Sequence, residues 1–129
     1  MSELVTPDCD MSMEARGDYL HVIAHGLDSA EVSLDICLAV SHEIAHTEIR
    51  KVLFEDYLDM QKAKHVDIIR FIQRVVLIRI PLTTKIAVVC KADKYGTNQF
   101  IVTTLSRLTP YTARVFTSKD EAEKWLETL

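Results

Sequence analysis

The chain is poor in the residues that mark several common functional classes. Its 129 residues include three glycines, three prolines and one tryptophan, and aromatic residues make up 7% of the whole. Such a low content of glycine and proline excludes collagen-like and linker-rich chains. The sequence has no GxGxxG or P-loop string for phosphate and no GxSxG string for a nucleophilic serine. Standard nucleotide sites and serine-hydrolase sites are therefore not expected.

Cysteine and long apolar runs are also scarce. The three cysteines, Cys9, Cys37 and Cys90, include no CxxC pair, and the last two lie within apolar runs. Buried free thiols of this kind are typical of a reducing compartment, so we expect a cytoplasmic protein. The most apolar region, residues 68–82, is interrupted by three arginines and a glutamine. We therefore expect no membrane span, and the first twelve residues lack the pattern of a signal peptide.

Charge is unevenly distributed along the chain. Residues 1–50 carry ten acidic and two basic side chains, whereas residues 51–94 carry five acidic and nine basic ones. The net charge of −4 argues against binding to nucleic acid. Arg70 and Arg74 are four residues apart and share one face of a predicted helix. That face is either simply solvated or contacts an acidic partner, such as the acidic half of a second copy.

Strand and helix patterns alternate along the rest of the chain. Apolar alternation, turn residues, helix-capping residues and 3/4 spacing set the expected boundaries. The expected elements are strands 11–15 and 19–25, helix 28–46, strand 51–55, helix 66–80, strand 85–90, helix 98–108, strand 112–116 and helix 118–126. The order β-β-α-β-α-β-α-β-α predicts an α/β protein with a mixed, mostly parallel sheet and packed helices.

Two further expectations concern the ends and the first helix. The chain length fits one domain, residues 1–129, with residues 1–9 as a loose N-terminal extension. Asp28 and Glu31 fit a helix start in which each side chain satisfies backbone amides. The expected buried stripe of this helix follows 3/4 spacing. It consists of Leu34, Cys37, Leu38, Ser41, Ile44 and Ala45.

One string in the first helix matches a metal-site motif. His42-Glu43-Ile44-Ala45-His46 is an HExxH pattern, in which two histidines on one helix face hold Zn²⁺ and the glutamate activates a bound water. The two histidines fall outside the expected buried stripe, so they should face solvent rather than a cleft. A third ligand is also missing from the pattern. We therefore expect no metal cofactor, and a zinc hydrolase at His42 and His46 stays a remote alternative.

The last third of the chain resembles a known family. The strands 85–89 and 112–116, together with Asp120-Glu121-Ala122 and Trp125-Leu126, are similar to the SpoIIAA-like, or STAS-like, family of small bacterial proteins. The predicted opening hairpin and the strand 52–56 also fit. The resemblance implies the fold and says little about activity. Physically, Ser118 and Glu121 can form a capping box, and Ala122, Trp125 and Leu126 can bury one helix face against the sheet.

The resemblance also implies a place for a site. Anti-sigma-factor antagonists of this fold are switched by phosphorylation of a serine after the third strand, but the matching stretch, 56–62, contains no Ser or Thr. The serine switch is therefore not expected. Ligands of such sheets favour the carboxyl ends of parallel strands. The candidate residues there are Asp56, Tyr57, Asp59, Lys91, Asp93 and Tyr95.

Three functions remain as hypotheses. The first is a non-enzymatic protein-interaction module, which acts on a partner or on a second copy of itself through the surface around Arg70 and Arg74. The second is a protein that binds a small molecule or lipid, since the fold family neighbours lipid carriers and the apolar helix within 68–82 could border a groove for an acyl chain. The third is the zinc hydrolase.

Overall fold

The protein has a six-stranded sheet with helices on both faces, as seen in the computed structural model, which describes residues 2–5, 9–60 and 65–128. The sheet order follows the chain, β1-β2-β3-β4-β5-β6. The first two pairings are antiparallel, and β3 to β6 run parallel. The strands are β1 Ser2–Val5, β2 Cys9–Arg16, β3 Tyr19–Asp28, β4 Lys51–Met60, β5 Lys85–Cys90 and β6 Thr112–Phe116. The predicted fold class is confirmed, with β1 added as an edge strand.

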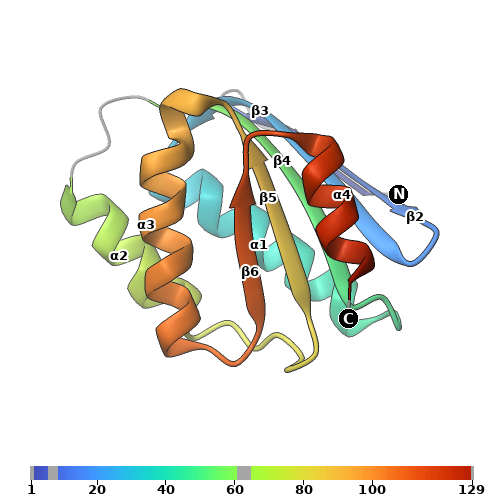
Figure 1. Ribbon diagram of the computed structural model, residues 1–129. Coiled ribbons are helices and arrows are strands. Elements are labelled where there is room, and N and C mark those ends of the chain that lie inside the picture. The colour runs from blue at the N-terminus through green and yellow to red at the C-terminus, as the bar shows by residue number, and fades with distance from the viewer. Residues whose placement is uncertain (1, 6–8, 61–64, 129) are drawn as a thin grey trace.

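Four helices complete the fold. They are α1 Ala30–Ala45, α2 His65–Val75, α3 Ala92–Leu108 and α4 Lys119–Glu127. Helices α1, α2 and α3 lie on one face of the sheet, and α4 lies on the other (Figure 1). Because β3 to β6 are parallel, their connecting helices fall on the same side, as right-handed crossovers require. The carboxyl ends of β3, β4 and β5 therefore meet at one edge of the sheet.

The core forms on both faces. On the α1 side, Ile36, Val40 and Ile44 pack against alternate residues of β2, β3 and β4. On the α4 side, the helix buries Ala122 and Leu126 against the sheet, and the rings of Phe116 and Trp125 are 5.7 Å apart. Ser118 caps α4 by accepting a hydrogen bond from the Glu121 amide. The predicted packing of this last helix is confirmed.

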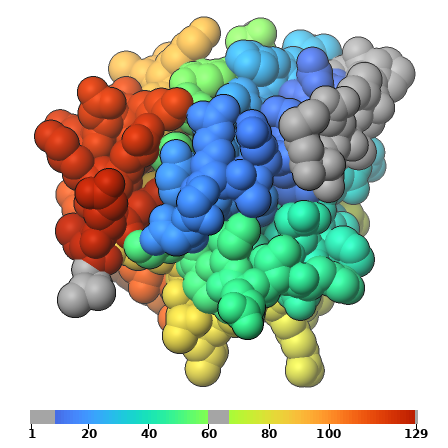
Figure 2. Space-filling view, turned by 90° about the vertical axis from the view of Figure 1, so that its right-hand side faces the viewer, coloured from blue at the N-terminus to red at the C-terminus, as the bar shows by residue number. Residues whose placement is uncertain are grey.

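The outer face is only partly covered. Figure 2 shows α4 beside the β2–β3 hairpin on the surface of the molecule. Helix α4 packs on β4, β5 and β6, so the outer side of the hairpin has no helix among the described residues above it. This half of the face carries polar and aromatic side chains rather than a continuous apolar surface.

The predicted details of α1 need correction. Ser29, not Asp28, is the N-cap and accepts a hydrogen bond from the Val32 amide. Of the six residues expected in the buried stripe, Ile44 is the one that is fully buried, while Leu38 and Ala45 are exposed. The reason is that α1 has two neighbours. Its residues Ile36, Val40 and Ile44 face the sheet, whereas Leu34 and Cys37 face α2 and α3, so the apolar positions spread over two directions.

Several boundaries also differ from the expected ones. Strand β4 continues to Met60, so residues 56–59 lie within a strand rather than after it. Helix α2 ends at Val75, and residues 76–80 form neither helix nor strand. Helix α3 begins at Ala92, six residues before the expected start at Asn98. The first nine residues, expected as a loose extension, include strand β1, which pairs with β2.

Candidate functional site

A cavity of about 340 Å³ lies between the sheet and helices α1, α2 and α3. A volume of this size is at the lower end of the usual range for small-molecule sites, about 300–1,000 Å³. Most of its walls are aliphatic or aromatic. The apolar lining includes Ile36, Val40, Phe54, Ile68, Phe71, Ile78, Ile80, Ile86, Val88, Ile101 and Leu105.

The cavity exists because α2 does not pack tightly on the sheet. Ile72 and Val75 of α2 pack with Leu34 and Cys37 of α1 and with Leu105 of α3. Underneath, Phe54, Ile86 and Val88 lie on β4 and β5, in the interior of the sheet, yet they are only partly buried. Central strand residues under a close-packed helix layer should be fully buried. Their partial exposure marks the open space between the two layers.

The cavity is elongated and has two different ends. Along β4 its lining runs from Val52 to Leu58, which at about 3.3 Å per residue is a length of about 20 Å. The end near Val52 lies at the amino ends of the parallel strands and is apolar. The end near Leu58 lies at their carboxyl ends and carries polar side chains. These are Asp28, Ser29, Ser33, Asp56, Asp67, Thr97 and Asn98.

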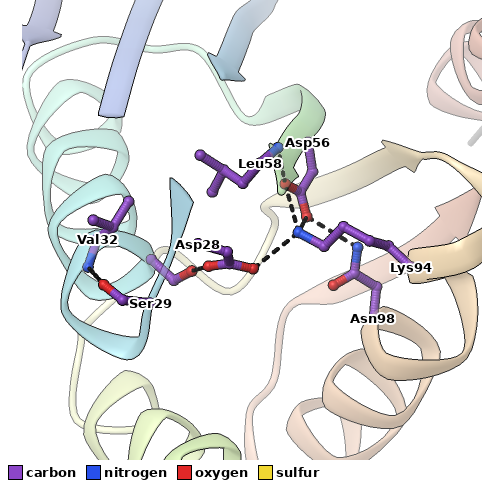
Figure 3. A network of polar contacts seen from close by, with 8 residues as sticks. Asp28, Ser29, Val32, Asp56, Leu58, Lys94 and Asn98 are labelled. Atoms are coloured by element: carbon purple, nitrogen blue, oxygen red, sulfur yellow. Dashed lines mark hydrogen bonds and ion pairs between the residues drawn. The ribbon is translucent and has the colours of Figure 1, made fainter. Parts of the chain in front are cut away.

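A network of hydrogen bonds and ion pairs organises this polar end (Figure 3). Lys94 Nζ lies 2.9 Å from Asp28 Oδ2 and 3.0 and 2.9 Å from the two carboxylate oxygens of Asp56. Asn98 donates from Nδ2 to Asp56 Oδ2, and the Leu58 amide donates to Asp56 Oδ1. The network joins the ends of β3 and β4 to the first turns of α3.

The network is buried, so the charges of Lys94, Asp56 and Asp28 interact strongly. The side chains of Lys94 and Asp56 are 5% and 7% exposed, so both charges have been removed from water. Burial alone would lower the pKa of Lys94, but the charges and hydrogen bonds of Asp56 and Asp28 outweigh it and raise that pKa above its usual value. Lys94 therefore stays charged, and its three N–H groups match the three carboxylate oxygens around it.

A second polar group lies on the opposite face of the sheet. His21 Nε2 is in hydrogen-bond contact with Glu55 Oε2, and Tyr57 donates to Glu55 Oε1 at 2.7 Å. Burial raises the pKa of Glu55, but the hydrogen bonds from Tyr57 and His21 and the charge of Lys119 outweigh it, so the pKa is lowered. The same hydrogen bond to Glu55 raises the pKa of Tyr57 to about 12. The carboxylate thus stays ionised and the phenol stays neutral.

The candidate residues from the sequence fall into separate places. Asp56, Tyr57, Asp59, Lys91 and Asp93 surround a small hollow of about 20 Å³ at the carboxyl edge of the sheet. A hollow of that size holds roughly one water molecule. Tyr57 also reaches the outer face, where its ring lies 5.3 Å from that of His25. Tyr95 does not line this hollow and is exposed on α3.

The residues that organise the large cavity were missed in the sequence. Lys94 and Asn98 are one helical turn apart and both face inward, but the expected helix began only at Asn98. Asp28 was expected to cap α1, whereas it accepts from Ser33 Oγ and binds Lys94. The signal that could have found them is the i, i+4 pair of polar residues at 94 and 98, together with an acidic residue directly after the predicted strand 51–55.

Arg70 and Arg74 are exposed on α2 and are not part of the cavity lining. Their basic surface continues into a segment with exposed apolar residues, where Leu77 is 79% and Leu82 is 70% exposed. The surface named by the sequence is therefore accessible.

His42 and His46 are exposed on α1, with ring centroids 4.2 Å apart. The His46 ring is also hydrogen-bonded to the backbone carbonyl of His42 through Nδ1. A search of the described residues finds no group of three or more histidine, cysteine, aspartate or glutamate side chains placed to hold a metal. The HExxH string thus offers two ligands on an open surface.

The thiol nearest the cavity is held in its neutral form. Cys37 lines the cavity. Burial raises the pKa of Cys37 to about 12. Because the thiolate is the reactive form, Cys37 at neutral pH is part of the apolar wall.

Taken together, the sheet and its helices define an α/β protein with a SpoIIAA-like fold. A solved structure described as an uncharacterized protein from the DUF3478 family with a SpoIIAA-like fold, from Shewanella loihica PV-4, is similar to this chain with a TM-score of 0.53. The two are 14% identical, and the similarity covers 98% of each chain. No family model and no curated protein matches this chain. Within the described part of the chain, no helix is long and apolar enough to cross a membrane.

Proposed function

We propose that the protein is a non-catalytic binding protein that holds a small apolar molecule between its sheet and helices α1 to α3. The observation that carries this proposal is the cavity of about 340 Å³ over Phe54, Ile86 and Val88. A cavity of this size in a well-packed protein costs stability because its walls lose packing contacts, so its presence favours a binding role. An elongated apolar lining with polar groups at one end fits a molecule with an apolar body.

Among the described residues that line the cavity there is no reactive constellation, which supports binding rather than catalysis. Lys94 is neutralised by two carboxylates, and Cys37 is held as a thiol. Neither group is available as a base or nucleophile at neutral pH. The thiols of Cys37 and Cys90 support a reducing, cytoplasmic setting for the protein.

The test uses a neutral fluorescent probe, N-phenyl-1-naphthylamine, displaced by decanol. We expect the probe to bind to the wild type and decanol to displace it. V88F places a larger side chain on the strand that lines the cavity, so it should abolish both probe binding and displacement by decanol. I23F is the matched control, because Ile23 is half-buried on the other face of the sheet. Absence of probe binding to folded wild type, or full binding to folded V88F, would contradict the proposal.

A second candidate function, contact with an acidic partner, is favoured by the basic outer side of α2. Arg70 and Arg74 are exposed there, and Leu77 and Leu82 add exposed apolar surface nearby. Basic residues around apolar ones are common at protein contacts. We propose a protein partner or a second copy of this chain as the occupant. The charge-reversed variant R70E/R74E should lose self-association, measured by light scattering, or lose binding to a protein partner, measured by a pull-down assay. If both self-association and partner binding are unchanged in the variant, this surface is rejected.

A further inference from the structure

The polar end of the cavity carries an excess of negative charge. Three carboxylates line it, those of Asp28, Asp56 and Asp67, and among the described residues no lysine, arginine or histidine does. Lys94 lies behind this lining and compensates one carboxylate. From this charge distribution we infer that the ligand is an amphiphile with a cationic, amine-type head group. This inference rests on the proposed function of the cavity and assigns its ligand class.

The lysine cannot serve an anionic head group. A lysine ammonium has three N–H donors. In this protein all three are matched by carboxylate oxygens, one from Asp28 and two from Asp56, at 2.9–3.0 Å. To bind a carboxylate or phosphate, Lys94 would have to leave buried carboxylates unpaired, which is costly. The ion pairs therefore make Lys94 a structural counter-ion rather than a ligand-binding cation.

The carboxylates at this end of the cavity can accept further hydrogen bonds. Asp56 already accepts from Lys94, Asn98 and the Leu58 amide. The Asp28 side chain is 22% exposed and faces the cavity from the end of β3, and Asp67 faces it from the first turn of α2. Carboxylates in a partly dry cavity favour a ligand that donates hydrogen bonds and brings positive charge.

Helix ends do not reverse this charge balance. The amino ends of α1, α2 and α3 lie at the same edge of the sheet, and each acts as about half a positive charge. Each already has a carboxylate close by: Asp28 or Glu31 at α1, Asp67 at α2 and Asp93 at α3. The three half charges and the charge of Lys94 together are smaller than the three full charges of Asp28, Asp56 and Asp67, so the balance at this end stays negative.

The experiment compares decylamine with decanoate, which have equal chains and opposite head-group charges. Both are titrated at neutral pH against the wild type loaded with N-phenyl-1-naphthylamine. We expect decylamine to bind at least about tenfold more tightly than decanoate, because one head group is attracted and the other repelled. D67N should reduce the difference in affinity between decylamine and decanoate, because it removes one of the carboxylates that line the polar end. D93N is the matched control, because Asp93 lies in the first turn of α3 but lines only the small hollow.

The outcomes separate this inference from the proposed function. Decanoate binding as tightly as decylamine, or a preference that D67N leaves unchanged, overturns the inference. In both cases displacement by decanol still supports an apolar site. Failure of all three compounds in folded wild type overturns the proposed function as well. Circular dichroism of each variant establishes that it is folded before its binding is compared.

Discussion

Lys94 is the residue on which the polar end of the cavity depends. It connects Asp28 of β3 with Asp56 of β4 from its position on α3. Such a buried ion pair contributes little compared with a well-packed apolar substitute, but loss of one partner leaves a buried charge uncompensated. Its main physical effect is to hold three elements in register where the cavity opens.

The first prediction follows from this pairing. K94M leaves Asp56 charged and buried, so we expect the free energy of unfolding in urea to fall by about 3–5 kcal/mol. The double variant K94M/D56N should be more stable than K94M, because the uncompensated charge is then removed. K91M is the control, since Lys91 is exposed. A loss in K94M no larger than that in K91M would show that the network is not as coupled as described.

Glu55 gives the second prediction, a pH dependence. Its pKa is lowered in the folded protein, so its ionised form contributes stability that is fully present above the unfolded pKa of about 4.3. That contribution is lost as the pH falls through the folded pKa. E55Q should therefore be less stable than the wild type at neutral pH, by about 1–3 kcal/mol, and the gap should close at acidic pH.

Thermal unfolding of both proteins between neutral and strongly acidic pH checks this. E14Q is the control, because Glu14 is exposed on β2. A gap between the wild type and E55Q that stays constant with pH would mean that the ionised carboxylate is not the source of the stability.

At the scale of elements, the short strands β5 and β6 were the easiest to predict. The boundaries of β5 and β6 match the expected strands because β-branched runs end at polar or capping residues on both sides. The start of α3 was missed because 92–97 is polar and contains Gly96, which weakens a helix pattern although tertiary contacts of Lys94 and Asn98 stabilise it there. The buried face of α1 was predicted wrongly because some of its apolar residues pack on the sheet and others on α2 and α3.

Helix α4 provides a prediction at this scale. Lys85 of β5 donates to the carbonyls of Trp125 and Thr128 at the helix end, and its ammonium lies 4.4 Å from the Trp125 ring centroid. The cation strengthens the cap of the helix, in which the Trp125 carbonyl also accepts from the amide and hydroxyl groups of Thr128. K85M should therefore lower stability by about 1–3 kcal/mol, measured by urea unfolding, while K124M on the exposed side should change it little. Equal effects of the two would contradict this role.

At the scale of the whole molecule, the cavity depends on contacts that no single segment encodes. The sequence indicated a groove beside the apolar stretch 68–82, and Ile68, Phe71, Val75, Ile78 and Ile80 of that stretch do line the cavity. The size of the space and its acidic end depend on how α1 and α3 hold α2 away from the sheet, which periodicity does not specify. Asp28 and Asp67 are 39 positions apart in the sequence and come to line the same cavity only in the folded protein.

Ligand binding should also stabilise the molecule as a whole. A ligand that binds only the folded state raises the free energy of unfolding by about 2.7 kcal/mol at a concentration of 100 times its Kd. We expect decanol or decylamine to raise the Tm of the wild type and of I23F. The Tm of V88F should not change, because its cavity is filled. An equal rise in V88F would indicate binding at another surface.

The most direct test of the cavity as a binding site is a methyl NMR titration with decanol, using protein labelled at the isoleucine δ1 methyl groups. Six isoleucines line the cavity: Ile36, Ile68, Ile78, Ile80, Ile86 and Ile101. Ile23 lies on the other face of the sheet and serves as an internal reference. We predict saturable shifts for the cavity methyl groups and none for Ile23. Shifts absent from the six, or centred on Ile23, would contradict the account.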